Sequence, residues 1–252
     1  MKKKLYHKSE TIFSESHPVL RDIRKLVRNK RAILEVECGK GNRLKAVSSN
    51  NEELAGTNTS KDAMRQAKSL FPEYTFVEAE PDSLPFTDNY FNVAYCFKLC
   101  QTSIPEKVIK EMIRVVRTRG LVVFVDENFG APLWCFPERK TNRTWKLLSG
   151  FIGDAICLIA GNRTGKLSWK QFKLSLGKQS NQNNKDMVTE PYLRSLVSFL
   201  RSLGLEIVTF SSFWELNKPS NSVTTTVCRI LGKLGVYPFR YWGPQLFVVA
   251  RK

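Results

Sequence analysis

The sequence predicts an α/β fold with a doubly wound, mostly parallel seven-stranded sheet, an antiparallel last strand and an insertion after the fifth strand. Three observations predict this fold. Short apolar runs alternate with helical stretches between residues 31 and 127, and a glycine-containing turn directly follows the first run. The chain also has 252 residues, of which 42% are hydrophobic, so it can bury a substantial core.

The expected elements follow from the period of the apolar residues. Parallel strands are expected at 32–36, 53–57, 74–78, 91–96 and 120–126. Helices are expected between them at 42–49, 60–70 and 105–117, the last with Pro105 and Glu106 in its first turn and arginines at its end. Further along the chain we expect an amphipathic helix at 191–204, a strand at 205–210 and the last strand at 244–252.

We interpret the chain as one domain in four parts. Residues 1–30 form an N-terminal cap, 31–127 the core, 128–187 a basic lid insertion, and 188–252 the final helix and last two strands. The most apolar segment of the insertion, residues 145–161, is too short to span a bilayer. It is expected to pack against the domain or to touch a membrane or an acyl chain.

The net charge of +17 lies outside the core. Residues 32–127 hold 12 basic and 14 acidic side chains, so the three remaining parts carry all of the excess. Basic flanks around a neutral core fit an anionic substrate, a phospholipid surface or RNA. A solvated basic surface without a partner is the simpler interpretation.

Cysteine and histidine usage predicts a reduced, cytoplasmic protein without a metal site. The six cysteines include no C-x-x-C pair, and the chain has only two histidines to join them as ligands. The charged first residues are not followed by an apolar run, so neither a secretory signal nor a membrane anchor is expected there.

Four segments carry the pattern of a nucleotide-type cofactor site. The strand I-L-E-V-E runs into C-G-K-G-N, where Gly39 and Gly41 allow positive φ and close approach of a ligand. The others are L-A-G-T-N-T-S at 54–60, F-V-E-A-E-P-D-S-L-P-F-T-D-N-Y-F-N-V-A-Y-C at 76–96, and P-E-K-V-I-K-E-M-I-R-V-V-R-T-R-G-L-V-V-F-V-D at 105–126.

In this order the four segments resemble class I, Rossmann-like methyltransferases of the type 11 group. The resemblance implies that the chain binds S-adenosyl-L-methionine. By the same resemblance, the cofactor-binding positions are Glu35, Glu37, Cys38, Gly39, Gly41, Asn58, Thr59, Glu80, Pro81, Asp82, Phe97 and Lys98.

Two of these positions depart from the family pattern. Glu37 replaces the first glycine of the turn, where its side chain is expected to crowd the methionine part of the cofactor or to pair with its ammonium group. Asn58 stands where relatives have an acid that holds the ribose hydroxyls. Replacing Glu37 by glycine and Asn58 by aspartate is therefore expected to tighten cofactor binding.

Methyl transfer mainly needs alignment of the acceptor beyond the carboxyl ends of the strands. This places Lys98, Cys100 and Gln101 after the fourth strand, and Asp126 and Glu127 after the fifth. If a hydroxyl must lose its proton, the candidate catalytic bases are His17, Asp126 and Glu127. Each is also explained as a polar loop residue or a helix cap.

The absence of two sequence motifs narrows the class of methyl acceptor. Residues 97–101 read F-K-L-C-Q rather than the N-P-P-Y tetrapeptide of enzymes that methylate exocyclic amines, and no Pro-Cys nucleophile pair is present. We expect O-methylation of a small-molecule, glycan or lipid-linked acceptor, with peripheral membrane contact through the basic lid. An RNA-directed methyltransferase or RNA-binding protein and an inactive methyltransferase-like scaffold remain alternatives. No oligomeric state follows from the sequence.

Overall fold

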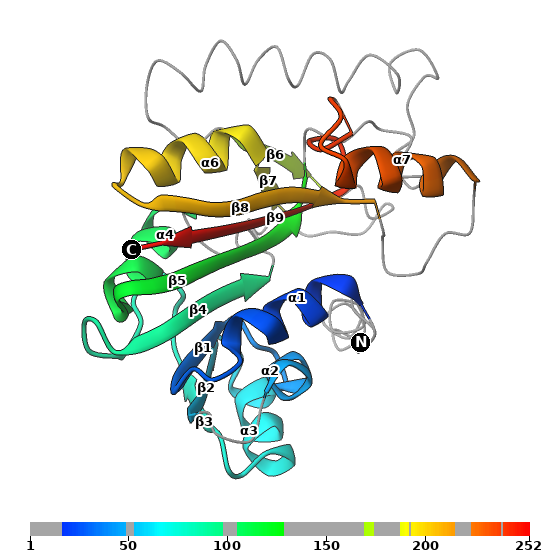
Figure 1. Ribbon diagram of the computed structural model, residues 1–252. Coiled ribbons are helices and arrows are strands. Elements are labelled where there is room, and N and C mark those ends of the chain that lie inside the picture. The colour runs from blue at the N-terminus through cyan, green and yellow to red at the C-terminus, as the bar shows by residue number, and fades with distance from the viewer. Residues whose placement is uncertain are drawn as a thin grey trace. The chain divides into compact units, whose positions relative to one another are not determined.

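The computed structural model describes residues 17–48, 53–97, 105–128, 169–173, 187–191, 193–214, 223–237 and 239–252 (Figure 1). It divides into two compact units. The first unit comprises the chain up to Phe97 together with Pro105–Val123 and Arg251–Lys252, and the second unit comprises the remainder. The expected lid segment 145–161 and the residues Lys98, Cys100 and Gln101 lie outside the described residues.

Seven strands form one sheet in the order β3-β2-β1-β4-β5-β9-β8. Their bounds are β1 Ala32–Val36, β2 Glu53–Asn58, β3 Thr75–Glu78, β4 Phe91–Phe97, β5 Val116–Glu127, β8 Glu206–Phe213 and β9 Gln245–Arg251. Strands β1 to β4 pair in parallel. Two hydrogen bonds flank the pair β5 and β9: the Arg119 N–H donates to Lys252 O, and the Asn128 N–H donates to Pro244 O. Because the chain numbers rise along β5 while they fall along β9, these two strands run in opposite directions. The expected mixed seven-stranded sheet is confirmed.

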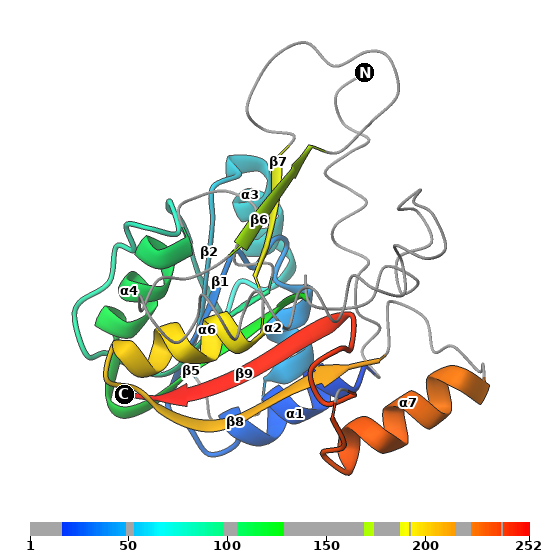
Figure 2. The same cartoon turned by 90° about the horizontal axis from the view of Figure 1, so that it is seen from above.

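The helices of the first unit are α1 Pro18–Val27, α2 Asn42–Val47, α3 Lys61–Leu70 and α4 Pro105–Val115. Strands β1 and β4 are buried along their whole length, which explains why their sequences are almost continuously apolar. Helices α1 and α2 lie side by side (Figures 1 and 2). Helix α1, which was not among the expected elements, has a proline in its first turn and buries one apolar face through Val19, Leu20, Ile23 and Val27.

The boundary between α4 and β5 differs from the prediction. We expected the helix to continue to residue 117 and the strand to begin at Gly120, but α4 ends at Val115 and β5 begins at Val116. Arg119 has a positive φ of 63°, and a Cβ atom at Gly120 would lie 2.6 Å from Val116 Cγ1. A tight kink within β5, rather than a loop before it, therefore accommodates the Arg-Gly pair.

The carbonyl groups at the end of α4 are satisfied from other parts of the chain. The Asn89 N–H donates to Arg114 O at 3.0 Å and the Tyr90 N–H to Val115 O at 2.8 Å. The Lys252 ammonium donates to Ile113 O and Val116 O, both at 2.8 Å, and to the Asn89 side chain. These contacts replace the missing helical partners and place a positive charge at the negative end of the helix dipole.

Replacing Lys252 by methionine is expected to lower the free energy of unfolding by about 2 kcal/mol, because charged hydrogen bonds to a helix end are lost while the aliphatic stem is kept. Denaturation by urea measures this change. The control is Lys25→Met, which removes an exposed ammonium that pairs with Asp22 at 3.2 Å and should change stability by less than about 0.5 kcal/mol. Equal losses in the two variants would contradict the proposed helix-end role.

The second unit contains α6 Leu193–Ser202 and α7 Val223–Lys233 besides β8 and β9. Strands β6 Trp169–Lys173 and β7 Met187–Pro191 form a separate antiparallel pair. Helix α6 was expected to start at residue 191, but Pro191 is the last residue of β7 and the helix begins at Leu193. Helix α7 was not among the expected elements.

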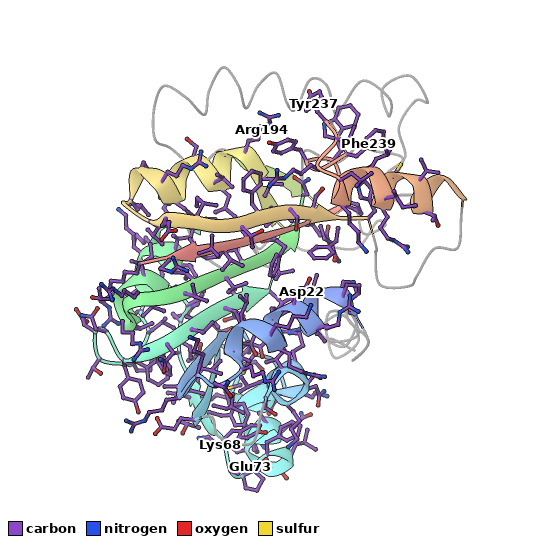
Figure 3. The ribbon with its side chains drawn as sticks, in the orientation of Figure 1. Asp22, Lys68, Glu73, Arg194, Tyr237 and Phe239 are labelled. Carbon is purple, nitrogen blue, oxygen red and sulfur yellow. The ribbon has the colours of Figure 1, made fainter. Side chains whose placement is uncertain are left out.

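A small aromatic core lies in the second unit. Its buried members are Trp214, Cys228 and Trp242, against which Phe239 and Tyr241 pack. Figure 3 shows Arg194 reaching from α6 toward the chain that carries Tyr237 and Phe239. The Arg194 guanidinium lies 4.1 Å from the centre of the Tyr241 ring and 5.7 Å from that of Tyr237, which are cation–π distances. No helix in the described parts of the chain is long and apolar enough to cross a membrane.

Candidate functional site

The turn that leaves β1 has the backbone expected of a ligand-binding glycine turn. Glu37, Gly39 and Gly41 have φ values of 60°, 58° and 82°, so three of its five residues are left-handed. The Cys38 N–H donates to Thr57 O at 2.9 Å, and the Gly41 N–H donates to Cys38 O at 3.1 Å. Helix α2 then begins at Asn42. The turn therefore lies at the carboxyl end of a parallel strand and in front of a helix, where nucleotide-type cofactors bind.

Close packing fixes this turn against β2 and β3. A Cβ atom at Gly41 would lie 2.8 Å from Phe76 Cζ and 3.2 Å from a Phe71 ring carbon. A Cβ atom at Gly56 of β2 would lie 2.6 Å from Cys38 Sγ. Both glycines are thus required for the fit of the turn onto its neighbours, and Gly41 is also required for its positive φ.

A buried ion pair lies beneath the turn. Arg43 Nε donates to Glu35 Oε1 at 2.8 Å, and Arg43 Nη2 donates to Glu37 O at 2.9 Å. The Tyr95 hydroxyl donates to Glu35 Oε2 at 3.2 Å, and the guanidinium lies 4.9 Å from the centre of the Phe97 ring. Burial raises the pKa of Glu35, and the Arg43 charge opposes this rise.

The sequence analysis did not identify Arg43. One signal was available, because an arginine in the first turn of a helix lies at the positive end of the helix dipole and needs a nearby anion. The buried Glu35 supplies that anion, and its side chain has no exposed surface. Glu35 therefore acts through Arg43, which it orients toward the backbone of the turn.

Glu37 and Asn58, the two departures from the family pattern, contact each other. Asn58 Nδ2 donates to Glu37 Oε2 at 3.0 Å, and Asn58 Oδ1 accepts the Ser60 N–H at 2.9 Å. Burial raises the pKa of Glu37 to about 7; the Thr59 N–H that faces the carboxylate lowers it, and the Glu80 charge raises it. Glu80 is exposed and follows β3 together with Pro81, which is buried, and Asp82.

The structure thus brings most expected cofactor positions together in the first unit, at the carboxyl ends of β1, β2, β3 and β4. Cys38 and Phe97 are buried there, with exposed fractions of 2% and 3%. His17 is the N-cap of α1, where its Nδ1 accepts the Val19 N–H at 3.3 Å. Asp126 and Glu127 end β5, and Asp126 Oδ1 accepts the Glu127 N–H at 2.7 Å.

Asn128, which follows Glu127, was not anticipated. Its side-chain amide donates to Tyr241 O at 2.6 Å and to Gly243 O at 2.9 Å within the second unit. Its side chain has no exposed surface. Asn128 therefore holds the segment before β9 beside the end of β5, a structural role that no spacing in the sequence indicated.

The family comparison agrees with the geometry. Residues 34–124, which include the turn, the Glu37–Asn58 pair and β5 up to Phe124, match the family model of a methyltransferase domain. This part of the chain is similar to methyltransferase domains. S-adenosylmethionine is the cofactor expected of such a domain. No curated protein shows significant sequence similarity to the chain.

Solved structures share the fold of this chain. An S-adenosylmethionine-dependent methyltransferase from Mesorhizobium loti superimposes with a TM-score of 0.59 at 15% identity, covering 95% of this chain and 98% of that chain. One from Methanosarcina mazei gives a TM-score of 0.56 at 17% identity, covering 92% and 96%. The [4+2]-cyclase SpnF gives a TM-score of 0.55 at 15% identity, covering 92% and 79%. The fold is therefore shared, while the SpnF example shows that the fold alone does not determine the reaction.

Proposed function

We propose that this methyltransferase transfers the methyl group of S-adenosylmethionine to an oxygen atom of a small-molecule, glycan or lipid-linked acceptor. The observation that carries the proposal is the left-handed turn from Glu37 to Gly41, which is followed by a helix and in which the Glu37 carboxylate accepts a hydrogen bond from Asn58, the last residue of β2. Such a turn exposes backbone N–H groups at a helix N-terminus and leaves space for a ligand to approach the main chain.

The residues present fit the cofactor. Glu37 Oε1 is buried and makes no hydrogen bond of normal geometry within the described residues, so an acceptor for ligand hydroxyl groups is available. Gly39 and Gly41 carry no side chain above the turn. We assign to the turn the amino-acid part of the cofactor, and to Glu37, Asn58 and the segment Glu80–Asp82 its nucleoside part. When bound, the cofactor supplies an electrophilic methyl group.

The acceptor hydroxyl needs alignment and, for a poorly acidic alcohol, a base. We propose Asp126, Glu127 and His17 as candidates for that base. Asp126 is 6% exposed and His17 5% exposed, so both side chains are largely removed from solvent. Replacement by asparagine or glutamine distinguishes a base from a cap, because a base variant lowers kcat without changing the affinity for the cofactor.

Isothermal titration with S-adenosylhomocysteine, the demethylated product, tests the cofactor assignment. Binding at micromolar to submillimolar concentration is expected, and the absence of heat at millimolar ligand would leave only the inactive-scaffold interpretation. Transfer of a labelled methyl group from S-adenosylmethionine to a panel of lipid-linked, glycan and small-molecule alcohols then tests the acceptor class.

One surface feature favours a lipid-linked acceptor. Val227 and Ile230 lie on α7 and Leu234 directly follows its last residue, and these three side chains are 47%, 52% and 72% exposed. The helix has no acidic residue, and Arg229 and Lys233 lie on it. An apolar stripe with basic neighbours is the pattern of a helix that lies on an anionic membrane surface.

Vesicle sedimentation tests this surface. We expect binding to vesicles that contain phosphatidylserine, weaker binding to pure phosphatidylcholine, and loss of binding in the variant Ile230→Ser, Leu234→Ser. Leu70→Ser is the control, because Leu70 is 54% exposed but belongs to α3 of the first unit. If RNA binds with a steep salt dependence while vesicles do not bind, the RNA-directed alternative is favoured instead.

A further inference from the structure

The amide of Asn58 is fully oriented by its contacts. Its Oδ1 accepts the Ser60 N–H at 2.9 Å, and a backbone N–H can only donate. Nδ2 must therefore be the atom that faces Glu37, to which it donates at 3.0 Å. The acceptor atom of residue 58 is thus already engaged by the backbone. Asn58 is also 8% exposed, so it presents little surface to a ligand.

The carboxylate of Glu37 has the opposite character. Its Oε2 is held by Asn58, whereas its Oε1 is buried without a hydrogen bond of normal geometry in the described residues. Burying an acceptor without a hydrogen-bond donor costs free energy, and a ligand whose hydroxyl groups donate to that acceptor removes the cost. Glu37 also keeps a left-handed φ of 60° that a glycine would adopt without strain. A side chain at this position is therefore retained against a conformational cost.

We propose that Glu37 is the carboxylate that binds the ribose hydroxyls of the cofactor, and that Asn58 is the residue that positions it. In sites of this kind an acid at the end of the second strand accepts the ribose hydroxyl bonds. The last register pair of β1 and β2 is Val36 with Thr57, so Glu37, which follows β1, and Asn58, which ends β2, both come directly after that pair. The acid thus stands in the turn after β1 in exchange for the end of β2, and the contact with Asn58 holds its carboxylate beside that end. This inference rests on the proposed function.

The exchange explains why residue 58 is an amide. An aspartate there would place two carboxylates about as close as the present 3.0 Å contact, and only one of them could then ionise. The asparagine instead donates to the carboxylate and leaves Oε1 for the ligand. The two departures are thus one coupled feature, rather than two independent losses of cofactor affinity.

The inference also gives a pH dependence. Burial raises the pKa of Glu37 to about 7. The Thr59 N–H and the Arg43 charge lower this pKa, and the Glu80 charge raises it. The neighbouring Cys38 thiol stays neutral, because burial raises its pKa far above its usual range. Hydroxyl donors favour the ionised carboxylate, so binding lowers this pKa and releases a proton. Affinity is therefore highest above pH 7 and falls as pH decreases through 7, by about tenfold between pH 8 and pH 6.

The experiment is a double-mutant cycle with S-adenosylhomocysteine as the probe. Titration calorimetry compares the wild type with Glu37→Gly, Asn58→Asp and the double variant, at pH 6 and pH 8. We expect each single variant to bind about 10- to 100-fold more weakly, and the double variant to return to within about fivefold of the wild type. The tenfold pH effect should disappear in Glu37→Gly.

The 2′-deoxy form of the same probe supplies a readout that a structural role would not change. The wild type should bind the deoxy probe at least about tenfold more weakly, while Glu37→Gly should bind both probes equally. Glu37→Gln, which keeps the size of the side chain, should retain part of this discrimination but lose the pH dependence. Circular dichroism and thermal melting check that each variant is folded.

The outcomes separate this inference from the proposed function. The inference is overturned if Glu37→Gly binds more tightly than the wild type and the wild type binds the deoxy and hydroxyl probes equally. The Glu37 side chain would then only crowd the site, while the proposed cofactor binding would stand. If neither the wild type nor the double variant binds the probe, the proposed function fails and the inference fails with it.

Discussion

Replacing Arg43 by methionine is expected to lower the free energy of unfolding by about 3 to 5 kcal/mol. The guanidinium is the partner of Glu35, whose side chain has no exposed surface, at 2.8 Å. Without it the carboxylate is left buried and unpaired, and the Glu37 carbonyl also loses its donor. Chemical denaturation measures this loss of stability. The affinity for S-adenosylhomocysteine should also fall, because Arg43 no longer donates to the backbone of the turn.

The sign of the pH effect provides a second check on Arg43. In the variant, the Arg43 charge no longer opposes burial, and only the Tyr95 hydroxyl and the Leu44 N–H still lower the pKa of Glu35, so this pKa rises further above the value in the unfolded chain. Above the pKa of an exposed glutamate, the folded variant still holds a proton on Glu35 that the unfolded chain has released. The free energy of unfolding of the variant therefore decreases as pH rises above that value, and it recovers at lower pH. Glu35→Gln in the Arg43→Met background should restore part of the loss.

The matched control is Arg65→Met. Arg65 pairs with Asp62 at 2.6 Å, but the two side chains are 78% and 72% exposed, so this variant should lose less than about 1 kcal/mol. If the Arg43 and Arg65 variants lose the same stability, the buried pair does not support the turn.

Gly41→Ala is expected to lower the free energy of unfolding by about 2 to 4 kcal/mol, and to lower the affinity for S-adenosylhomocysteine more than tenfold. The left-handed φ costs an alanine about 1 to 2 kcal/mol. The added Cβ would also lie 2.8 Å from Phe76 Cζ, and the same ring lies 2.9 Å from a Cβ built at Gly56, so it cannot move aside easily. The turn must therefore shift.

Gly204→Ala separates the two causes. Gly204 has a φ of 83°, like Gly41, but nothing lies within 4 Å of a Cβ built there. Its variant should therefore lose only the conformational part, about 1 to 2 kcal/mol, and should keep the cofactor affinity of the wild type. A loss in Gly41→Ala no larger than that in Gly204→Ala would contradict the packing argument.

The core of the fold was predictable because its strands are buried on both faces. The apolar runs at 32–36 and 91–96 correspond to β1 and β4 almost residue for residue. The elements that were missed have weaker local signals. Helix α7 contains the run Val-Thr-Thr-Thr-Val, whose β-branched residues favour strands, and the boundary between α4 and β5 lies between two adjacent valines.

The site was predictable as a set of positions but not as a set of contacts. Gly39 and Gly41 could be located from the turn pattern alone. The contact between Glu37 and Asn58 depends on the register of β1 against β2, which pairs Val36 with Thr57. Sequence reasoning treated the two residues separately because it did not set that register. Arg43 was missed because its partner Glu35 was considered only as a ligand-binding residue.

The Cys38 thiol packs against Gly56, so its chemical labelling can report local opening of the first unit. Cys38 and Cys96 are 2% and 1% exposed, and neither forms a disulfide. Burial raises the pKa of Cys38 well above its usual range, so we expect the native thiol to react slowly with alkylating reagents at neutral pH. Mass-spectrometric labelling of these two thiols over time therefore reports how often the first unit opens, without any introduced probe, and slower labelling with bound S-adenosylhomocysteine would measure how far the ligand closes it.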